Sequence, residues 1–355
     1  MKPLRSLMIA ALLAACAQPA GSAPLPQDEP AARAERPREA ELRAACRRDA
    51  LRHCPEEVRS RDLRAARACL RREAATLSDD CAAALGPDAA AQEDPRGTEY
   101  SYGPTPLQDL RLSLAPCPAA PLVVFVHGGA WSVGDKDSGA GDKAAFYNAR
   151  GYHFATVNYR LHPEVSVAES AGDVASAVAW LTGQRPEAVR GVALQGHSAG
   201  AHLAALVALD GRYLTRAGVP QGAIKAVSLL DGAGYDIAEQ VRVGGNADLY
   251  RAVFGDDPAR WAALSPMTYA TGSGTEAAFV AHYVAARAAS AMQSQALAKT
   301  LNQDGVTAAA IPAKDRTHAS LNRRFGEAGD PVAEQVIAVL SEAVPPCMPG
   351  RPPRP

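Results

Sequence analysis

The 355-residue sequence lacks an excess of charge of either sign, because 37 Lys and Arg residues oppose 38 Asp and Glu residues. A formal net charge of -1 provides no broad basic surface for nucleic acid, and it predicts that bulk charge does not select the substrate. Internal repeats of solenoid period are also missing. The length and a hydrophobic content of 47% instead predict one large domain with a small appendage.

A hydrophobic run long enough to span a membrane is missing near the amino terminus. The run within residues 1–15 follows Lys2 and Arg5, and its length predicts an export signal. The letters "LAAC", ending at Cys16, resemble the bacterial lipobox, which implies a lipoprotein signal peptide, lipidation of Cys16 and a membrane anchor in the bacterial cell envelope. The alternative is an ordinary export signal that is removed together with Cys16. Residues 16–40 are rich in Pro, Ala and charge without apolar periodicity, which predicts a flexible tether.

No two cysteines form a C-x-x-C pair of the kind found in zinc sites, and export favours disulfides over metal binding. Metal binding by the four clustered thiols is the alternative. An even number of cysteines remains after Cys16, which predicts a disulfide framework. The six cysteines are Cys46, Cys54, Cys69, Cys81, Cys117 and Cys347. A bridge between the last two would clamp the carboxyl-terminal tail.

Residues 41–86 contain two helix-like stretches that carry two cysteines each. If the stretches pack as an antiparallel hairpin, nested Cys46–Cys81 and Cys54–Cys69 bonds would stabilise a unit too small to hold itself by core burial. The sequence therefore predicts a small cysteine-rich helical hairpin.

The same segment resembles the cysteine-rich repeat of Golgi-apparatus cysteine-rich proteins. The resemblance implies a scaffold rather than a chemistry, and it makes the segment a candidate for contact with another protein. The matching order is Cys46, Asp49, Cys54-Pro55, Cys69-Leu70, Leu77-Ser78 and Cys81.

Strand-like and helix-like patterns alternate over residues 97–347, which predicts a mostly parallel sheet with helices on both faces. Residues 232–275 are Gly-rich and irregular with one short helix, which suits a small cap over the carboxyl ends of the strands. The expected strands lie at 122–127, 153–159, 191–197, 224–231, 277–284 and 307–313.

The stretch "VALQGHSAGAHLAAL" places Ser198 between two glycines where a strand becomes a helix. Gly-x-Ser-x-Gly at such a turn is the nucleophile elbow of α/β-hydrolases. Gly196 and Gly200 remove side chains that would collide, so that the strained serine exposes its hydroxyl at the head of a helix. Ser198 is the candidate nucleophile.

The motif His-Gly-Gly-Ala-Trp (127–131) follows another strand upstream of the elbow, where α/β-hydrolases complete an oxyanion hole. We expect the main-chain N–H groups of Gly129, Ala130 and Ala199 to hold the oxyanion of a tetrahedral intermediate.

In the order Ser, acid, His, the general base follows the nucleophile. His202, His282 and His318 meet this condition. His202 lies on the elbow helix and His282 within a strand, whereas His318 follows the last strand on a loop before the last helix. The sequence therefore favours His318 as the base.

The HGGAW and GHSAG motifs and the loop "THASLNR" resemble those of α/β-hydrolase esterases of the hormone-sensitive-lipase and kynurenine-formamidase-like group, over roughly residues 97–345. The resemblance implies the α/β-hydrolase fold, catalysis by Ser198 and His318, and no metal or organic cofactor.

The acid of that group is missing from its usual place, since residues 277–295 contain no Asp or Glu and Ala286 or Ala289 occupies the position. Asp231, at the end of the preceding expected strand, is the nearest substitute. Asp236 and Asp315 are further options.

These residues predict a serine carboxylic-ester hydrolase that forms an acyl-enzyme on Ser198 with a small-molecule ester. An amide or formamide substrate would use the same groups. The alternative from another class is a catalytically impaired hydrolase fold that serves as a binding or scaffold protein of the cell envelope.

Overall fold

The chain divides into two units, residues 1–92 and 93–355. The computed structural model describes residues 96–184 and 191–347 of the larger unit, and residues 42, 44–55, 58, 66, 69, 70, 73 and 76–85 of the smaller one. The predicted signal peptide, the lipidation site at Cys16 and the tether lie outside the described residues. Within the described part of the chain, no helix has the length and hydropathy of a bilayer span.

Disulfides organise the smaller unit. They join Cys46 to Cys81 and Cys54 to Cys69, the nested arrangement expected for a hairpin. Residues 44–53 are helical, and α4 (Asp79–Leu85) carries the last of these cysteines. All four cysteines are buried. Among the described residues of this unit, sulfur thus forms much of the buried core.

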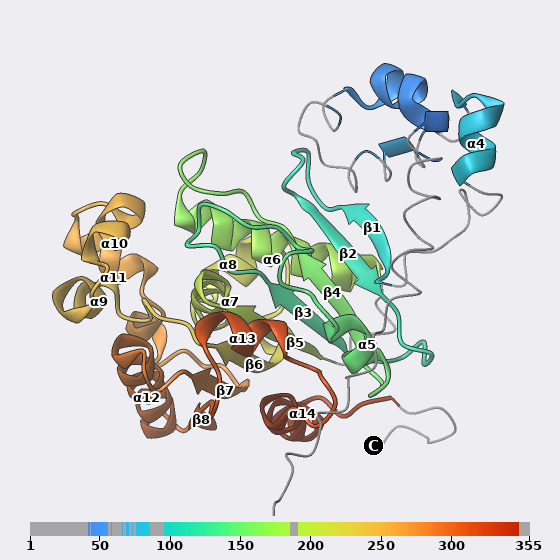
Figure 1. Cartoon of the computed structure of the whole chain (residues 1–355). Helices are drawn as coiled ribbons and strands as arrows, with labels where there is room; N and C mark the ends of the chain where they lie inside the picture. Colours follow the sequence, from blue (N-terminus) through green and yellow to red (C-terminus); the bar gives the residue numbers. More distant parts are fainter. Residues whose placement is uncertain are drawn as a thin grey trace, which may run out of the picture. The chain divides into compact units, whose positions relative to one another are not determined.

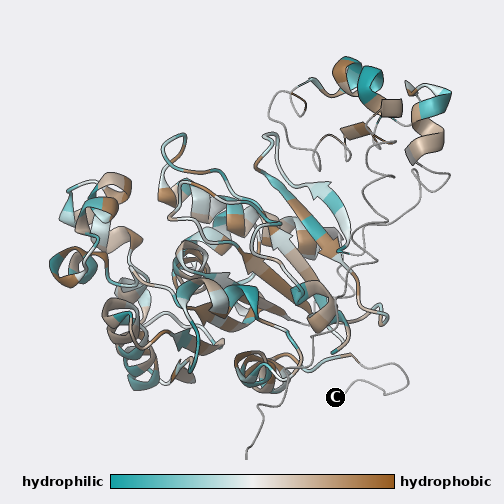
Figure 2. Ribbon diagram, viewed as in Figure 1, coloured by the Kyte–Doolittle hydropathy of each residue, from teal (hydrophilic) through white to brown (hydrophobic). Residues whose placement is uncertain are grey.

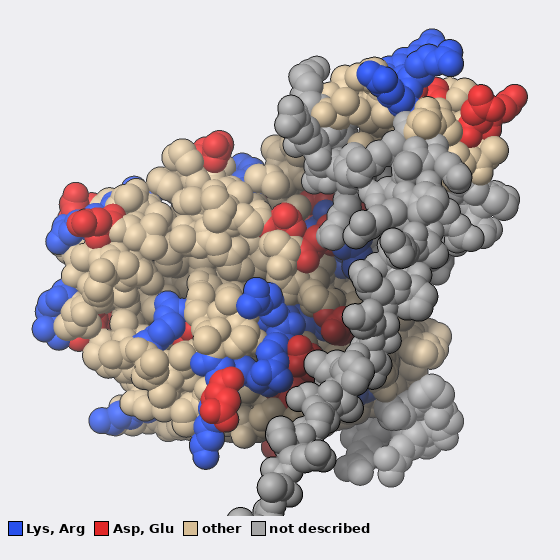
Figure 3. Space-filling view, viewed as in Figure 1, with Lys and Arg blue, Asp and Glu red and all other residues tan. Residues whose placement is uncertain are grey.

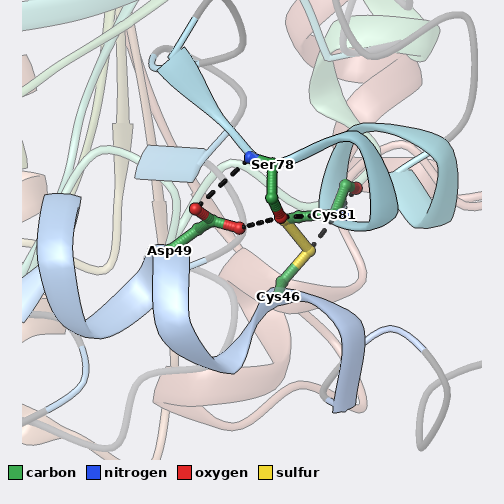
Figure 4. The surroundings of a disulfide bond; sticks show 4 residues. All are labelled: Cys46, Asp49, Ser78 and Cys81. Carbon is green, nitrogen blue, oxygen red and sulfur yellow. Dashed lines mark hydrogen bonds between the residues drawn. A yellow bond between two sulfur atoms is a disulfide. The ribbon is translucent and has the colours of Figure 1, made fainter.

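A carboxylate and a hydroxyl reinforce the outer disulfide. The Asp49 carboxylate accepts hydrogen bonds from the Ser78 hydroxyl at 2.6 Å and from the Ser78 N–H at 3.4 Å (Figure 4). Ser78 directly precedes α4, so these bonds fix the start of that helix against the helix that carries Cys46.

The larger unit is built on a sheet with the strand order β1-β2-β4-β3-β5-β6-β7-β8 (Figure 1). Pairing is parallel from β4 to β8, and β1 and β2 add an antiparallel edge. The predicted mostly parallel sheet is confirmed. The antiparallel hairpin was not predicted, because its short strands lack a long apolar run. The strands are β1 (Thr98–Ser101), β2 (Asp109–Ser113), β3 (Leu122–Val126), β4 (His153–Val157), β5 (Val192–His197), β6 (Ile224–Leu230), β7 (Ala278–Tyr283) and β8 (Ala308–Pro312).

Helices cover both faces of the sheet, and the central strands are hydrophobic along their length (Figure 2). In β3, Val124 and Val126 enter the core that α6 and α7 share, whereas Val123 and Phe125 enter the core under α5 and α14. Alternate side chains point to opposite faces, so a strand covered on both sides must be apolar throughout. The helices are α5 (Lys143–Asn148), α6 (Val167–Gln184), α7 (Ala199–Leu209), α8 (Arg212–Arg216), α12 (Ala288–Gln303), α13 (His318–Arg323) and α14 (Pro331–Ala343).

The segment between β6 and β7 forms a helical cap. It contains α9 (Ile237–Val243), α10 (Ala247–Phe254) and α11 (Pro258–Leu264), followed by the short 3-10 helix η3 (Pro266–Tyr269). A second 3-10 helix, η2 (Gln221–Ala223), precedes β6. The sequence predicted only the helix at α10, because the flanking helices have seven residues each and show too little periodicity.

A third disulfide joins Cys117, before β3, to Cys347, after α14. The Cys347 N–H also donates a hydrogen bond to the Gly151 carbonyl at 3.1 Å. The tail is therefore held before the starts of β3 and β4, by the bridge that the sequence predicted as a clamp.

Candidate active site

The side chains singled out in the sequence follow the carboxyl ends of strands in the parallel part of the sheet. Ser198 directly follows β5 and Asp231 directly follows β6, the neighbouring strand. His318 begins α13, a few residues after β8. Carboxyl ends of parallel strands meet at one edge of a sheet, which is where ligands bind in open α/β folds.

Ser198 has an unfavourable backbone conformation, with φ 55° and ψ -120°. A non-glycine residue held in such a region costs about 1–3 kcal/mol, so the surroundings must enforce it. The Ser198 N–H donates to the Leu230 carbonyl at 3.0 Å. A Cβ atom added to Gly196 would lie 2.2 Å from the Gly200 carbonyl oxygen, and a Cβ atom added to Gly200 would lie 2.1 Å from the Val126 carbonyl oxygen. Both glycines are thus required for β3, β5 and α7 to approach this closely.

The loop after β3 is also strained. Gly129, Ala130 and Trp131 all have positive φ, of 130°, 51° and 62°. A Cβ on Gly129 would lie 1.8 Å from the Val133 carbonyl oxygen. The Val133 N–H in turn donates to the Gly129 carbonyl at 3.0 Å, which closes the turn and fixes the direction of its main-chain groups.

One cavity of about 610 Å³ brings the predicted site together. Its wall includes the candidate triad residues Ser198, Asp231 and His318. The three expected oxyanion-hole residues, Gly129, Ala130 and Ala199, line the same cavity.

Asp231 and His318 form a direct pair. The His318 Nδ1 donates to the Asp231 Oδ2 at 2.7 Å, which leaves Nε2 as the basic nitrogen. Asp231 is 1% exposed, whereas the His318 side chain is 36% exposed to the cavity and solvent. Thr317 caps α13 reciprocally with Ser320, which fixes the turn that presents the imidazole.

The Asp231 carboxylate also accepts hydrogen bonds from neighbouring groups. Oδ1 accepts from the Ser290 hydroxyl at 2.6 Å and from the Val284 N–H at 3.0 Å. Oδ2 accepts from the Arg287 Nη1 at 2.7 Å. Burial alone would raise the pKa of the Asp231 carboxyl. The hydrogen bond from His318 and the contacts with the three groups named above outweigh burial and lower the pKa to about 2.

Arg287 is a site residue that the sequence analysis missed. It precedes α12, within the segment where the family resemblance places the carboxylate. Its guanidinium contacts both the Asp231 carboxylate and the His318 Nδ1. The chain thus has a cation where the acid was expected, and the carboxylate that contacts His318 follows the neighbouring strand. The signal for Arg287 in the sequence was its position between Ala286 and Ala289, as a basic residue in the segment where an acid was expected.

His197 is the second residue that was missed. Its Nε2 donates to the His318 carbonyl oxygen at 2.9 Å, and the two rings lie with centroids 4.5 Å apart. Burial lowers the pKa of His197 to about 3, so the ring is neutral at pH 7. His197 therefore supports the backbone of His318 without adding a charge.

The other candidate bases are bound elsewhere. The His202 Nε2 donates to the Leu264 carbonyl at 2.8 Å, and the His282 Nε2 lies 2.9 Å from the Gln335 Oε1. Burial lowers the pKa of His202 to about 4. Among the candidate acids, Asp236 caps α9 and Asp315 is exposed on the turn after β8.

Within the part of the chain that the structure describes, no group of three or more His, Cys, Asp or Glu residues is arranged to hold a metal ion.

Comparison with known proteins gives a consistent assignment. A family model described as BD-FAE matches residues 109–301. A probable isoprenylcysteine alpha-carbonyl methylesterase, ICME, of Oryza sativa subsp. japonica is 32% identical over 170 residues, which are 45% of this chain and 40% of that protein. The kynurenine formamidase of Danio rerio is 34% identical over 99 residues, 28% of this chain and 33% of that protein. The chain thus spans less than half the length of either relative.

The fold itself is matched by solved structures. Esterase B of Lactobacillus Rhamnosis (HN001) superposes with a TM-score of 0.57 at 20% sequence identity, covering 87% of this chain and 95% of that one. The larger unit therefore has the α/β-hydrolase fold.

Proposed function

The chain belongs to the BD-FAE family, and we propose that it is a serine hydrolase that cleaves carboxylic esters through an acyl-enzyme on Ser198. The esterase relatives and the layout of the cavity support the proposal. The observation that carries it is the 2.7 Å bond between His318 and the buried Asp231, in the cavity that Ser198 also lines.

In the proposed first step, His318 Nε2 takes the Ser198 hydroxyl proton as Oγ attacks the ester carbonyl carbon. The carbonyl oxygen becomes an oxyanion, which the main-chain N–H groups of Gly129, Ala130 and Ala199 stabilise; one such donor contributes about 2.7–4 kcal/mol in related sites. Asp231 stays ionised and orients the imidazolium.

The intermediate then collapses, and the C–O bond to the alcohol breaks as His318 returns the proton to the leaving oxygen. In the second half, His318 removes a proton from water, and hydroxide attacks the acyl carbon. The bond between the acyl carbon and Ser198 Oγ then breaks, His318 returns its proton to Oγ, and the carboxylic acid product is released. No group outside the chain and water is required.

A fluorophosphonate probe and short-chain 4-nitrophenyl esters test the proposal. We expect wild-type protein to be labelled and to turn over the esters, and Ser198→Ala to lose both. Ser341→Ala, on α14, is the matched control, because within the described residues its hydroxyl bonds to carbonyls of its own helix alone. If the folded wild type is neither labelled nor active, the proposal is wrong and the scaffold alternative is favoured.

We also propose that the protein is a lipoprotein of the bacterial cell envelope anchored at Cys16; the lipobox-like "LAAC" supports this. Metabolic labelling with an alkyne fatty acid in a bacterial host, compared with Cys16→Ser, tests the anchor. Equal labelling of the two proteins would contradict it.

A further inference from the structure

We infer that the cavity binds esters that carry a carboxylate on their acyl or alcohol part, with Arg287 and Arg323 as the cationic groups that recognise it. This inference rests on the proposed esterase function and adds the substrate class to it.

The charged groups of the cavity wall are unbalanced. Among the described residues that line it, the charged side chains are Arg287, Arg323 and Asp231. Asp231 is nearly inaccessible and is already bound to its neighbours, so it presents little negative charge to an incoming ligand. These three side chains together give the wall a formal charge of +1. A substrate carboxylate would therefore meet two guanidinium groups, of which Arg287 is also ion-paired with Asp231, and no exposed acid.

Arg287 has donors to offer. Its side-chain contacts with Asp231 and His318, as the structure describes them, both use Nη1. A guanidinium carries five N–H donors in a planar fork, and the Arg287 side chain is 38% exposed. The remaining donors suit a carboxylate near the catalytic imidazole.

Arg323 supplies the second charge from another element. It is the last residue of α13 and is exposed where it lines the cavity. Within the described residues, it has no ion-pair partner. By contrast its neighbour Arg324 pairs with Glu327 at 2.8 Å and does not line the cavity. Figure 3 shows several basic side chains, with acidic ones among them, on the face of the molecule where α13 lies.

Much of the rest of the wall is apolar, although Ser138, Asn246 and Asn322 add neutral polar groups. Val133, on the loop after β3, is 63% exposed and Leu249, on α10, is 38% exposed, and both line the cavity with Trp131 and Tyr250. A ligand that fits both kinds of surface has an apolar chain or ring together with one carboxylate. The near-zero net charge of the whole chain does not oppose this, because the selection is local.

Two pairs of esters test the inference, each matched in size and differing in one charge. The first is 4-acetoxybenzoate against 4-acetoxybenzamide, with the charge on the alcohol part. The second is mono-4-nitrophenyl glutarate against 4-nitrophenyl pentanoate, with the charge on the acyl part. We expect kcat/KM, corrected for uncatalysed hydrolysis, to favour the anionic ester of at least one pair by about tenfold at low salt. The preference should shrink as salt is added.

Variants assign the preference to the two arginines. We expect Arg287→Gln to lower the ratio of anionic to neutral kcat/KM about tenfold and Arg323→Gln about threefold, because Arg323 is the more exposed. Effects on the nucleophile or on folding cancel in the ratio. Arg324→Gln removes the same charge one residue away and should leave the ratio as in wild type.

Equal kcat/KM within both pairs, or a ratio that neither Arg287→Gln nor Arg323→Gln changes, would overturn the inference while leaving the esterase proposal intact. Failure of the esterase proposal differs, because no ester would then be cleaved in a Ser198-dependent manner. In that case, calorimetric titration of Ser198→Ala with 4-hydroxybenzoate and glutarate decides the question. Binding that Arg323→Gln weakens supports the inference, and no heat of binding to either carboxylate rejects it.

Discussion

The two sides of the cavity are held in place by different means. Around Ser198 and the loop after β3, the geometry is set by main-chain contacts, and a single methyl group at Gly196, Gly200 or Gly129 would collide with backbone. Around Asp231, the geometry is set by side-chain hydrogen bonds from residues far apart in the chain. The first kind of constraint appears in sequence as a short motif, whereas the second does not.

Among the variants that compare the two sides, the largest expected effect comes from removing the charge at the centre of the side-chain network. Asp231→Asn should lower kcat/KM about 10³- to 10⁴-fold with the fold retained, because the amide favours the wrong imidazole tautomer and does not stabilise the imidazolium. Ester hydrolysis with circular dichroism as the folding check measures this. Asp236→Asn is the control, since asparagine also caps a helix well. A larger loss in the control than in Asp231→Asn would assign the acid to Asp236.

The main-chain side is tested by adding one methyl group. Gly200→Ala should lower turnover about 100-fold, because its Cβ would push α7 and Ser198 away from the oxygen of Val126 by a large part of an ångström. Gly172→Ala, in α6 where a Cβ meets nothing within 4 Å, should remain active. Turnover of the two purified variants is the measurement, and equal activity would show that the elbow tolerates a shift.

A smaller effect is expected at His197, where the two sides meet. His197→Phe keeps a ring against His318 but leaves the His318 carbonyl without its donor, and we expect a roughly tenfold loss of kcat/KM. His282→Phe removes another buried, hydrogen-bonded imidazole and is the control. An unchanged kcat/KM in His197→Phe would mean that the His197 ring contributes packing against His318 but that its hydrogen bond does not affect catalysis.

The smallest effect concerns pH. The folded pKa of Asp231 is about 2, below the ordinary value of 3.8, so its stabilising contribution is present above pH 4 and is lost as pH falls through the folded pKa. The whole contribution amounts to about 2 kcal/mol, of which about 1 kcal/mol is lost by pH 3. Urea unfolding at pH 7 and pH 3 should show that wild type loses about 1 kcal/mol more than Asp231→Asn. Equal losses of stability in the two proteins would contradict an ionised, stabilising Asp231 carboxylate in the folded protein.

The same comparison explains what the sequence could predict. Ser198 and its glycines lie within five residues, and the sterics that select them are local. His318 was identified from chain order and its place after the last strand. Asp231 remained one option among three, because only the packing of β6 against β7 decides which carboxylate reaches the imidazole.

Arg287 and His197 were beyond such reasoning. Arg287 contacts a residue 31 positions away, and His197 bonds to one 121 positions away. No local period or spacing encodes those contacts. In the smaller unit, by contrast, the nested bonds followed from the cysteine positions once an antiparallel hairpin was assumed, and the structure has these bonds. The resemblance of that unit to a Golgi repeat stays a prediction.

The bond between Cys117 and Cys347 turns the hydrolase unit into a covalent ring of chain 230 positions around. A protease that cuts once in an exposed loop inside the ring opens it without releasing a fragment, so the nicked protein keeps its mass until a reductant is added. Such a ring would let one cleavage pass without dispersing the residues that meet in the cavity.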